Sequence, residues 1–147
     1  MQSPCNLQSG KHPGGTAVPP AIPHSPLPKR ILVVQGDLAV SHTIREALTR
    51  DGHLVEVAHN GRQALGLFYS RGYDLVITEF RTAEIDGIGL AKVIKKLCPA
   101  TPVILLASGS GPALSYTRRM PKVDFLLLKP VSAVDVQAAL LRFFPAR

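Results

Sequence analysis

An acidic side chain closes the most strand-like stretch of this sequence. The apolar run Leu75–Ile77 is bounded by Glu79, which is the pattern of a strand that is covered on both faces. A turn signal follows at Asp86-Gly87. Open α/β sheets keep their chemistry at the carboxyl ends of their strands, so Glu79 is the first candidate for a functional carboxylate.

Two further charged side chains follow apolar runs. Asp37 comes shortly after the run Ile31–Val34, and Lys129 comes directly after Val123–Leu128 and before a proline. Asp37 could serve as a single ligand for a cation, but the ordinary role of an aspartate in this position is to stabilise a turn or cap a helix. Lys129 could reach a pocket at the end of the sheet or extend into solvent.

Strands and helices alternate along the chain and would position these side chains. Apolar runs predict five strands, at Ile31–Val34, Leu54–Ala58, Leu75–Ile77, Pro102–Ala107 and Val123–Leu128. Helical spacing of apolar residues predicts helices around 40–48, 64–68, 90–97 and 134–143, and 109–121 has room for a short fourth helix before the last of them. This alternation predicts an α/β fold, a doubly wound five-stranded parallel sheet with five flanking helices.

The composition indicates a single domain that is preceded by an N-terminal leader of different composition. The chain has 147 residues, and 46% of them are hydrophobic, which is enough to bury one core. Residues 1–30 hold seven of the thirteen prolines and show no apolar periodicity, so we predict a disordered leader at 1–30 and a domain at 31–147. Apolar runs are too short to cross a bilayer, so we expect a cytoplasmic protein with no membrane contact.

The net charge and the two cysteines predict neither nucleic-acid binding nor a disulfide or metal site. The formal net charge is +7, but most basic residues are scattered singly and accompany no nucleic-acid motif, so we consider nucleic-acid binding unlikely. Cys5 and Cys98 form neither a disulfide framework nor a metal spacing, and we expect two unpaired thiols.

Several separate stretches between residue 31 and about residue 144 carry a resemblance to one family. The matching stretches are Ile31–Val34, Val57–Leu65, Tyr73–Val76, Asp86-Gly87, Thr101–Ile104 and Lys129-Pro130. Together they resemble the receiver domain of two-component response regulators, the CheY-like family. The resemblance implies a flavodoxin-like fold and a cis peptide bond before Pro130.

The same resemblance implies that the phosphoryl-transfer site is degenerate. Receiver domains accept a phosphoryl group on an aspartate, and here Glu79 takes that place. The acidic pair that helps to hold Mg²⁺ is replaced by Gln35 and Gly36, with Asp37 one place later. We therefore expect no Mg²⁺, no other cofactor and no enzymatic activity, since a hard cation needs oxygen ligands of suitable charge and position.

The positions that would report phosphorylation are also substituted. The hydroxyl position holds Ala107, and the usually aromatic switch position holds Leu126. Of the residues that the family uses for phosphoryl transfer, this sequence keeps only the lysine, Lys129. It follows Ala107 by 22 residues, which is the spacing that the family uses. We predict a standing ion pair between Glu79 and Lys129 that replaces the metal and the phosphoryl group, and one fixed conformation.

These expectations lead to one predicted function and two alternative functions. We expect a stand-alone degenerate receiver that acts as a phosphorylation-independent protein-interaction module in two-component phosphorelay signalling, and a histidine kinase or another signalling protein as its partner. By family analogy the interaction face would include Arg118, Arg119 and Lys122. One alternative is a working phosphoacceptor that uses Glu79 or Asp37. The other is a nucleic-acid-binding regulator that uses the basic leader and the fourth helix.

Overall fold

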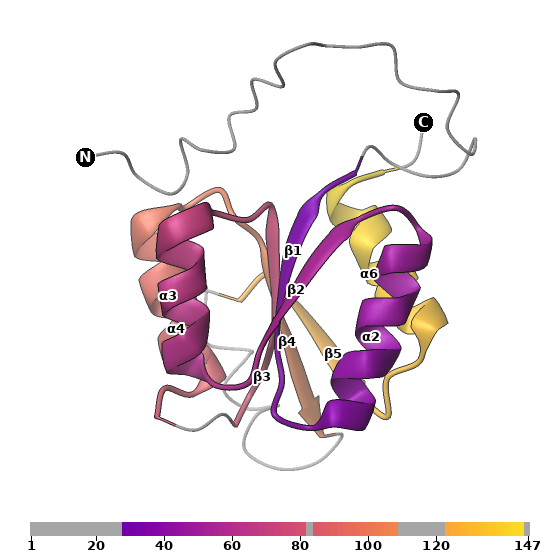
Figure 1. The fold of residues 1–147 in the computed structure, drawn as a ribbon, viewed down its shortest axis with the longest axis horizontal. Helices are drawn as coiled ribbons and strands as arrows, with labels where there is room; N and C mark the ends of the chain where they lie inside the picture. Colours follow the sequence, from indigo (N-terminus) through magenta and orange to yellow (C-terminus); the bar gives the residue numbers. More distant parts are fainter. Residues whose placement is uncertain (1–27, 82–83, 109–122, 146–147) are drawn as a thin grey trace, which may run out of the picture.

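The chain folds into one parallel sheet between two layers of helices. A computed structural model of the protein describes residues 28–81, 84–108 and 123–145. The sheet has five parallel strands in the order β2-β1-β3-β4-β5. Helices α2 and α6 cover one face, and α3 and α4 cover the other (Figure 1). The doubly wound α/β prediction is confirmed.

The strands and helices lie close to where the sequence predicts them. The strands are β1 (Arg30–Val34), β2 (Leu54–Ala58), β3 (Leu75–Glu79), β4 (Val103–Ser108) and β5 (Phe125–Lys129). The described helices are α2 (Leu38–Arg50), α3 (Gly61–Arg71), α4 (Gly87–Leu97) and α6 (Ala133–Phe143). The predicted short fourth helix lies outside the described residues, as does most of the predicted leader.

The two sides of the central strands build two separate cores. On β1, Ile31 and Val33 pack with residues of α2 and α6, whereas Leu32 and Val34 pack with residues of α3 and α4. Successive side chains of a strand point to opposite faces, so one uninterrupted apolar run supplies both cores. This explains why the strand that leads to Glu79 carries no polar alternation.

Every described helix begins at the carboxyl edge of the sheet with a polar cap. The N-cap residues are Asp37, Asn60, Asp86 and Ser132, and each side chain accepts a hydrogen bond from a backbone N–H of the first turn. These N-caps determine the residue at which each helix begins. They therefore fix the loops that surround Glu79 and Lys129.

Some sequence-based expectations need correction. Strand β3 extends two residues past the predicted run, to Glu79. Strands β4 and β5 begin one and two residues later than predicted and each end one residue later, so that Ser108 pairs with Lys129 in the sheet. The expectation of an unpaired thiol at Cys98 is wrong, because Cys98 is disulfide-bonded. Spacing along the chain could not reveal this, since it does not show which thiols meet in space. The Lys129-Pro130 bond is cis, as the resemblance implies.

None of the helices in the described ranges has the length and the apolar content that a bilayer crossing requires.

A buried histidine fixes the start of the described chain. His53 is 3% exposed, and its Nδ1 accepts a hydrogen bond of 3.0 Å from the backbone N–H of Lys29. Its Nε2 has no hydrogen-bond partner among the described residues. An acceptor at Nδ1 requires the neutral ring, and burial lowers the pKa of His53 below the ordinary value of 6.5.

We expect the domain to lose stability in acid through His53. Because the pKa of His53 is lower in the folded state, the unfolded chain binds more protons below pH 6.5, and the free energy of unfolding falls as the pH falls below that value. The variant His53→Asn keeps an acceptor for Lys29 and removes the titration, so its stability should change less between pH 7.5 and 5.5. Urea melts at both pH values check this, with the exposed His42→Asn as the control; equal pH dependence in all three proteins would contradict it.

Candidate functional site

The candidate site is an ion pair at the carboxyl edge of the sheet. Lys129 Nζ lies 2.5 Å from Glu79 Oε2, with side-chain exposures of 32% and 13%. Glu79 is the last residue of β3 and Lys129 the last residue of β5, and β4 lies between these strands. The predicted ion pair is therefore present, and two charges meet across the intervening strand.

Gln35 holds the other oxygen of Glu79. Its side-chain Nε2 donates a hydrogen bond of 2.6 Å to Glu79 Oε1, and its Oε1 accepts one of 3.0 Å from the backbone N–H of Asp37. Gln35 is 3% exposed, so this amide is fixed by its surroundings as well as by its partners. Both carboxylate oxygens of Glu79 thus have a donor of their own.

The role of Gln35 as a donor to Glu79 is not evident from the sequence. The resemblance marks Gln35 only as a neutral replacement for an acidic residue and implies no partner for it. The sheet register was the signal that could have found it: Val34 pairs with Thr78, so the next positions of the two strands, Gln35 and Glu79, lie opposite each other. A buried amide needs a partner for both ends, and this neighbour provides one.

Asp37 is a helix cap in this structure. Its Oδ1 accepts hydrogen bonds from the backbone N–H groups of Ala39 (2.9 Å) and Val40 (3.2 Å), and this confirms the capping role that we favoured. The residue is exposed, as is Gly36. Its carboxylate therefore serves the first turn of α2, and no hydrogen bond links that carboxylate to Glu79 or Lys129 in the part of the chain that the structure describes.

The two positions that should sense phosphorylation carry apolar side chains. Ala107 is 1% exposed, and Leu126 is half-buried on β5 opposite Leu105. Ser108 follows Ala107, but neighbouring strand residues face opposite sides, and Ser108 is exposed. Ser108 is therefore a poor substitute for a hydroxyl at position 107.

Two glycines let the loop after β3 pack closely beside the site. A Cβ at Gly87 would lie 2.4 Å from the backbone oxygen of Glu79, and a Cβ at Gly61 would lie 2.4 Å from the backbone oxygen of Ile85. The Gly87 N–H also donates a hydrogen bond of 2.8 Å to the oxygen of Phe80. These contacts hold the start of α4 directly against the end of β3.

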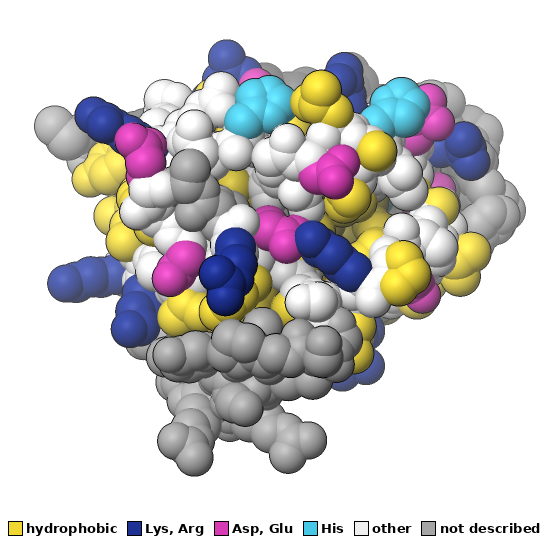
Figure 2. Space-filling view, turned by 90° about the horizontal axis from the view of Figure 1, so that it is seen from below, with side chains coloured by type: hydrophobic (Ala, Val, Ile, Leu, Met, Phe, Trp, Pro, Cys, Tyr) yellow, Lys and Arg dark blue, Asp and Glu magenta, His cyan; other side chains and the backbone are white. Residues whose placement is uncertain are grey.

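The surface around the site mixes both signs of charge. Viewed from below, the molecule presents Asp and Glu side chains interspersed with Lys and Arg side chains, with no single acidic cluster (Figure 2). Within residues 28–81, 84–108 and 123–145, no group of three or more His, Cys, Asp or Glu side chains could hold a metal ion. The proposed interaction-face residues Arg118, Arg119 and Lys122 lie outside the described residues.

Sequence comparisons identify the same family from the whole domain. The model of the response regulator receiver domain matches residues 31–141. The chain is 40% identical over 112 residues to the transcriptional regulatory protein ZraR of Escherichia coli O157:H7, which covers 75% of this chain and 25% of that protein. It is 30% identical over 119 residues to the response regulator MprA of Mycolicibacterium vanbaalenii, covering 79% of this chain and 52% of MprA.

Solved structures share the architecture. The chemotaxis response regulator CheY4 of Vibrio cholerae superposes with a TM-score of 0.72 at 20% sequence identity, covering 78% of this chain and 98% of CheY4. NtrX from Brucella abortus gives a TM-score of 0.71 at 25% identity, covering 79% of this chain and 26% of that one. Both comparisons agree with the flavodoxin-like arrangement of strands described above.

Proposed function

This chain belongs to the response regulator receiver domain family, and from that membership we propose that it is a degenerate receiver that acts without phosphorylation. Its role would be that of a protein-interaction module in two-component signal transduction. The observation that carries this proposal is the state of Glu79, whose two carboxylate oxygens are already bound by Lys129 and Gln35. A phosphoacceptor needs a carboxylate oxygen that can attack.

The charge balance of the pocket argues against Mg²⁺. Family members gather acidic side chains at this edge, and the cation relieves their repulsion. Here Glu79 and Lys129 balance each other, Gln35 is neutral, and the carboxylate of Asp37 caps α2. Because Mg²⁺ demands several oxygen ligands in near-octahedral geometry, these residues do not fit it. We therefore propose that the domain uses no metal and no other cofactor.

The position of the carboxylate also argues against turnover. A glutamate places its oxygens about one bond further from the strand than an aspartate, and misplacing reacting atoms by about 1 Å can cost on the order of 100-fold in rate. Without phosphorylation, and with apolar side chains at Ala107 and Leu126, these two positions would relay no signal from the pocket. The proposed domain is a binding module and not an enzyme.

The partner would be a histidine kinase or another protein of the signalling pathway, and the domain would act in the cytoplasm with it. The relatives ZraR and MprA are longer, and the chain spans a quarter and about half of their lengths. What those proteins regulate is therefore no guide to the partner of this domain. The kind of partner is inferred from the family alone.

Amide NMR spectra recorded with and without Mg²⁺ and beryllofluoride test this function. We expect no Mg²⁺-dependent shift at Glu79, Gln35 or Lys129, and no label from a radioactive acyl phosphate. The triple variant Gln35→Asp, Gly36→Asp, Glu79→Asp is the positive control, because it restores the carboxylates that a divalent cation needs. Shifts of the unaltered protein at low millimolar Mg²⁺, or a label on Glu79 or Asp37, would favour a working phosphoacceptor and overturn the proposal.

A further inference from the structure

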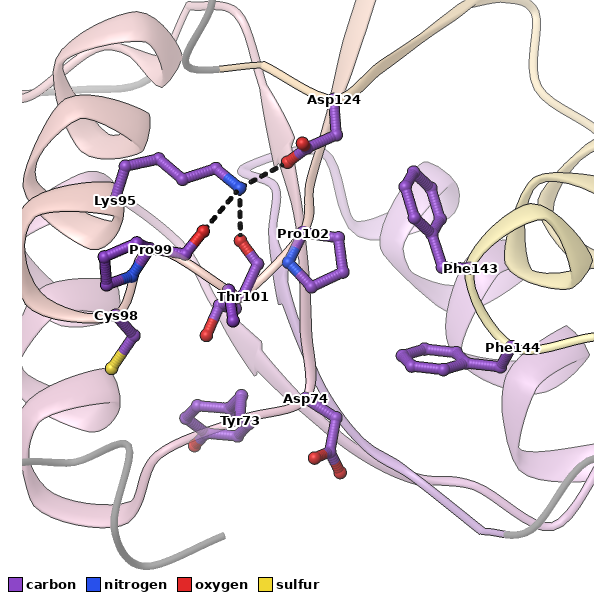
Figure 3. Close-up of a pocket in the computed structure, with 11 residues that line it drawn as sticks. Tyr73, Asp74, Lys95, Cys98, Pro99, Thr101, Pro102, Asp124, Phe143 and Phe144 are labelled. Atoms are coloured by element: carbon purple, nitrogen blue, oxygen red, sulfur yellow. Dashed lines mark hydrogen bonds and ion pairs between the residues drawn. The ribbon is translucent and has the colours of Figure 1, made fainter. Parts of the chain in front are cut away.

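An open pocket lies at the amino-terminal edge of the sheet, opposite the edge that holds Glu79 and Lys129. Its volume is about 620 Å³. Prolines and two partly exposed phenylalanine rings line much of it: Pro99 and Pro102 before β4, and Phe143 and Phe144 at the end of α6 (Figure 3). The ring of Tyr73 also borders the pocket but is completely buried. No role in the proposed function uses this pocket.

Polar contacts make one side of the pocket rigid. Lys95 Nζ lies 2.6 Å from Asp124 Oδ2 and donates a hydrogen bond of 2.7 Å to the backbone oxygen of Thr101 (Figure 3). The same Asp124 oxygen accepts a bond of 2.7 Å from the N–H of Val103. Lys95 is 12% exposed, and its charge is balanced by Asp124. These contacts hold the end of α4 against the start of β4 and β5 on one side of the pocket.

The described chain starts at the rim of this pocket. Lys29 Nζ lies 4.8 Å from the centre of the Phe144 ring, and the backbone N–H of Arg30 donates a bond of 2.8 Å to Asp74 Oδ2. Phe144 and Asp74 both line the pocket. Whatever conformation the preceding residues adopt, they are therefore attached beside it.

The chemistry of residues 1–27 suits the pocket. This segment contains six prolines and no acidic residue, and Lys11 is its one lysine. Proline-rich segments are extended before they bind, so they lose little entropy when they enter aromatic grooves. The absence of acidic residues also avoids repulsion by Asp74 and Asp124.

A covalent link points to the same segment. Cys98 lines the pocket and is disulfide-bonded. The sequence has one other cysteine, Cys5, which lies in the segment 1–27. From Cys5 to Pro28 the chain is 23 residues long, and at about 3.1 Å per residue it could span ~70 Å, far more than the pocket requires.

We propose that residues 1–27 dock in this pocket as an intramolecular proline-rich ligand and that a disulfide between Cys5 and Cys98 can lock them there. The lock would form by exchange with a small disulfide such as glutathione disulfide. One cysteine thiolate attacks that disulfide and releases one thiol, and the second cysteine then attacks the mixed disulfide and releases the other thiol. The protein is oxidised by two electrons, the small disulfide is reduced to two thiols, and the two cysteine protons end on those thiols.

Peptide mapping of the full chain tests the lock. After treatment with glutathione disulfide, we expect the monomer to contain a Cys5–Cys98 peptide pair that disappears on reduction and in the variant Cys5→Ser. A monomer with no such pair, or a covalent dimer in its place, would overturn the lock.

Limited proteolysis of the reduced full chain tests the docking itself. Trypsin cleaves after Lys11 when the segment is out of the pocket. The variant Ala100→Arg places a large cationic side chain at an exposed position of the lining, and we expect it to raise that cleavage rate by about tenfold if the docked state predominates by about ten to one. The matched control Ala39→Arg, exposed at the opposite edge, should match the wild type. Equal rates in wild type and Ala100→Arg would show that the pocket does not hold this segment.

Discussion

The variant Gly87→Ala should lose about 3 kcal/mol of folding free energy, the upper end of the usual cost of overpacking a core. The added Cβ would lie 2.4 Å from the backbone oxygen of Glu79 and 2.7 Å from Leu105 Cδ1. The first contact is with backbone, which cannot rotate away, so β3 or the start of α4 must move. Urea denaturation followed by circular dichroism measures the loss, since the chain has no tryptophan.

The matched control is the same substitution where there is room. Gly66 lies exposed in α3, and a Cβ there meets nothing within 4 Å. Gly66→Ala should therefore stabilise the domain by about 0.5 to 1 kcal/mol through helix propensity alone. If Gly87→Ala proved as stable as the wild type while Gly66→Ala behaved as expected, the close packing of α4 against Glu79 would be wrong.

The variant Lys129→Ala should lower the free energy of unfolding by about 1 to 3 kcal/mol. It leaves Glu79, whose side chain is only 13% exposed, without its charged partner. A fully buried pair would cost more to break, but Lys129 is 32% exposed, and water screens part of the interaction. Urea melts of the variant and of the wild type give the difference.

A double-mutant cycle separates the ion pair from other effects of the substitution. Glu79→Gln removes the negative charge and can keep the hydrogen bond to Gln35. If the pair contributes, Glu79→Gln and Lys129→Ala together should cost about 1 kcal/mol less than the sum of the single variants. The exposed pair Arg50 and Glu46 is the control, and Arg50→Ala should change stability by about 0.5 kcal/mol or less. Strict additivity at Glu79 and Lys129 would contradict a stabilising pair.

Much of the fold could be predicted because the strands carry their own signal. The run Leu75–Ile77 is completely buried, and its lack of alternation reflects burial on both faces. The ends of the strands were harder to predict: β3 extends two residues and β4 and β5 one residue past the predicted ends, because pairing in the sheet decides where a strand ends. Such pairing depends on neighbours that are distant in sequence.

The two charged residues of the site could be predicted from the sequence, but the role of the uncharged Gln35 could not. Glu79 and Lys129 carry opposite charges at the ends of apolar runs, and the resemblance to receiver domains implies that both lie in one pocket. Gln35 has no charge, and its role depends on the register of β1 against β3 and on the position of the Asp37 N–H. The disulfide of Cys98 was missed for a similar reason, since no local pattern marks a covalent contact.

The hydrogen bonds of Gln35 have a consequence for how such a domain could carry information. One buried amide joins the end of β1 to the end of β3, and Lys129 joins the end of β3 to that of β5. Under the proposed function, phosphorylation does not change the described residues of this edge. An edge with a constant state can influence a pathway only through the number of copies of the domain that present it. The synthesis and degradation of the domain, compared with the amount of its partner, would then set the response.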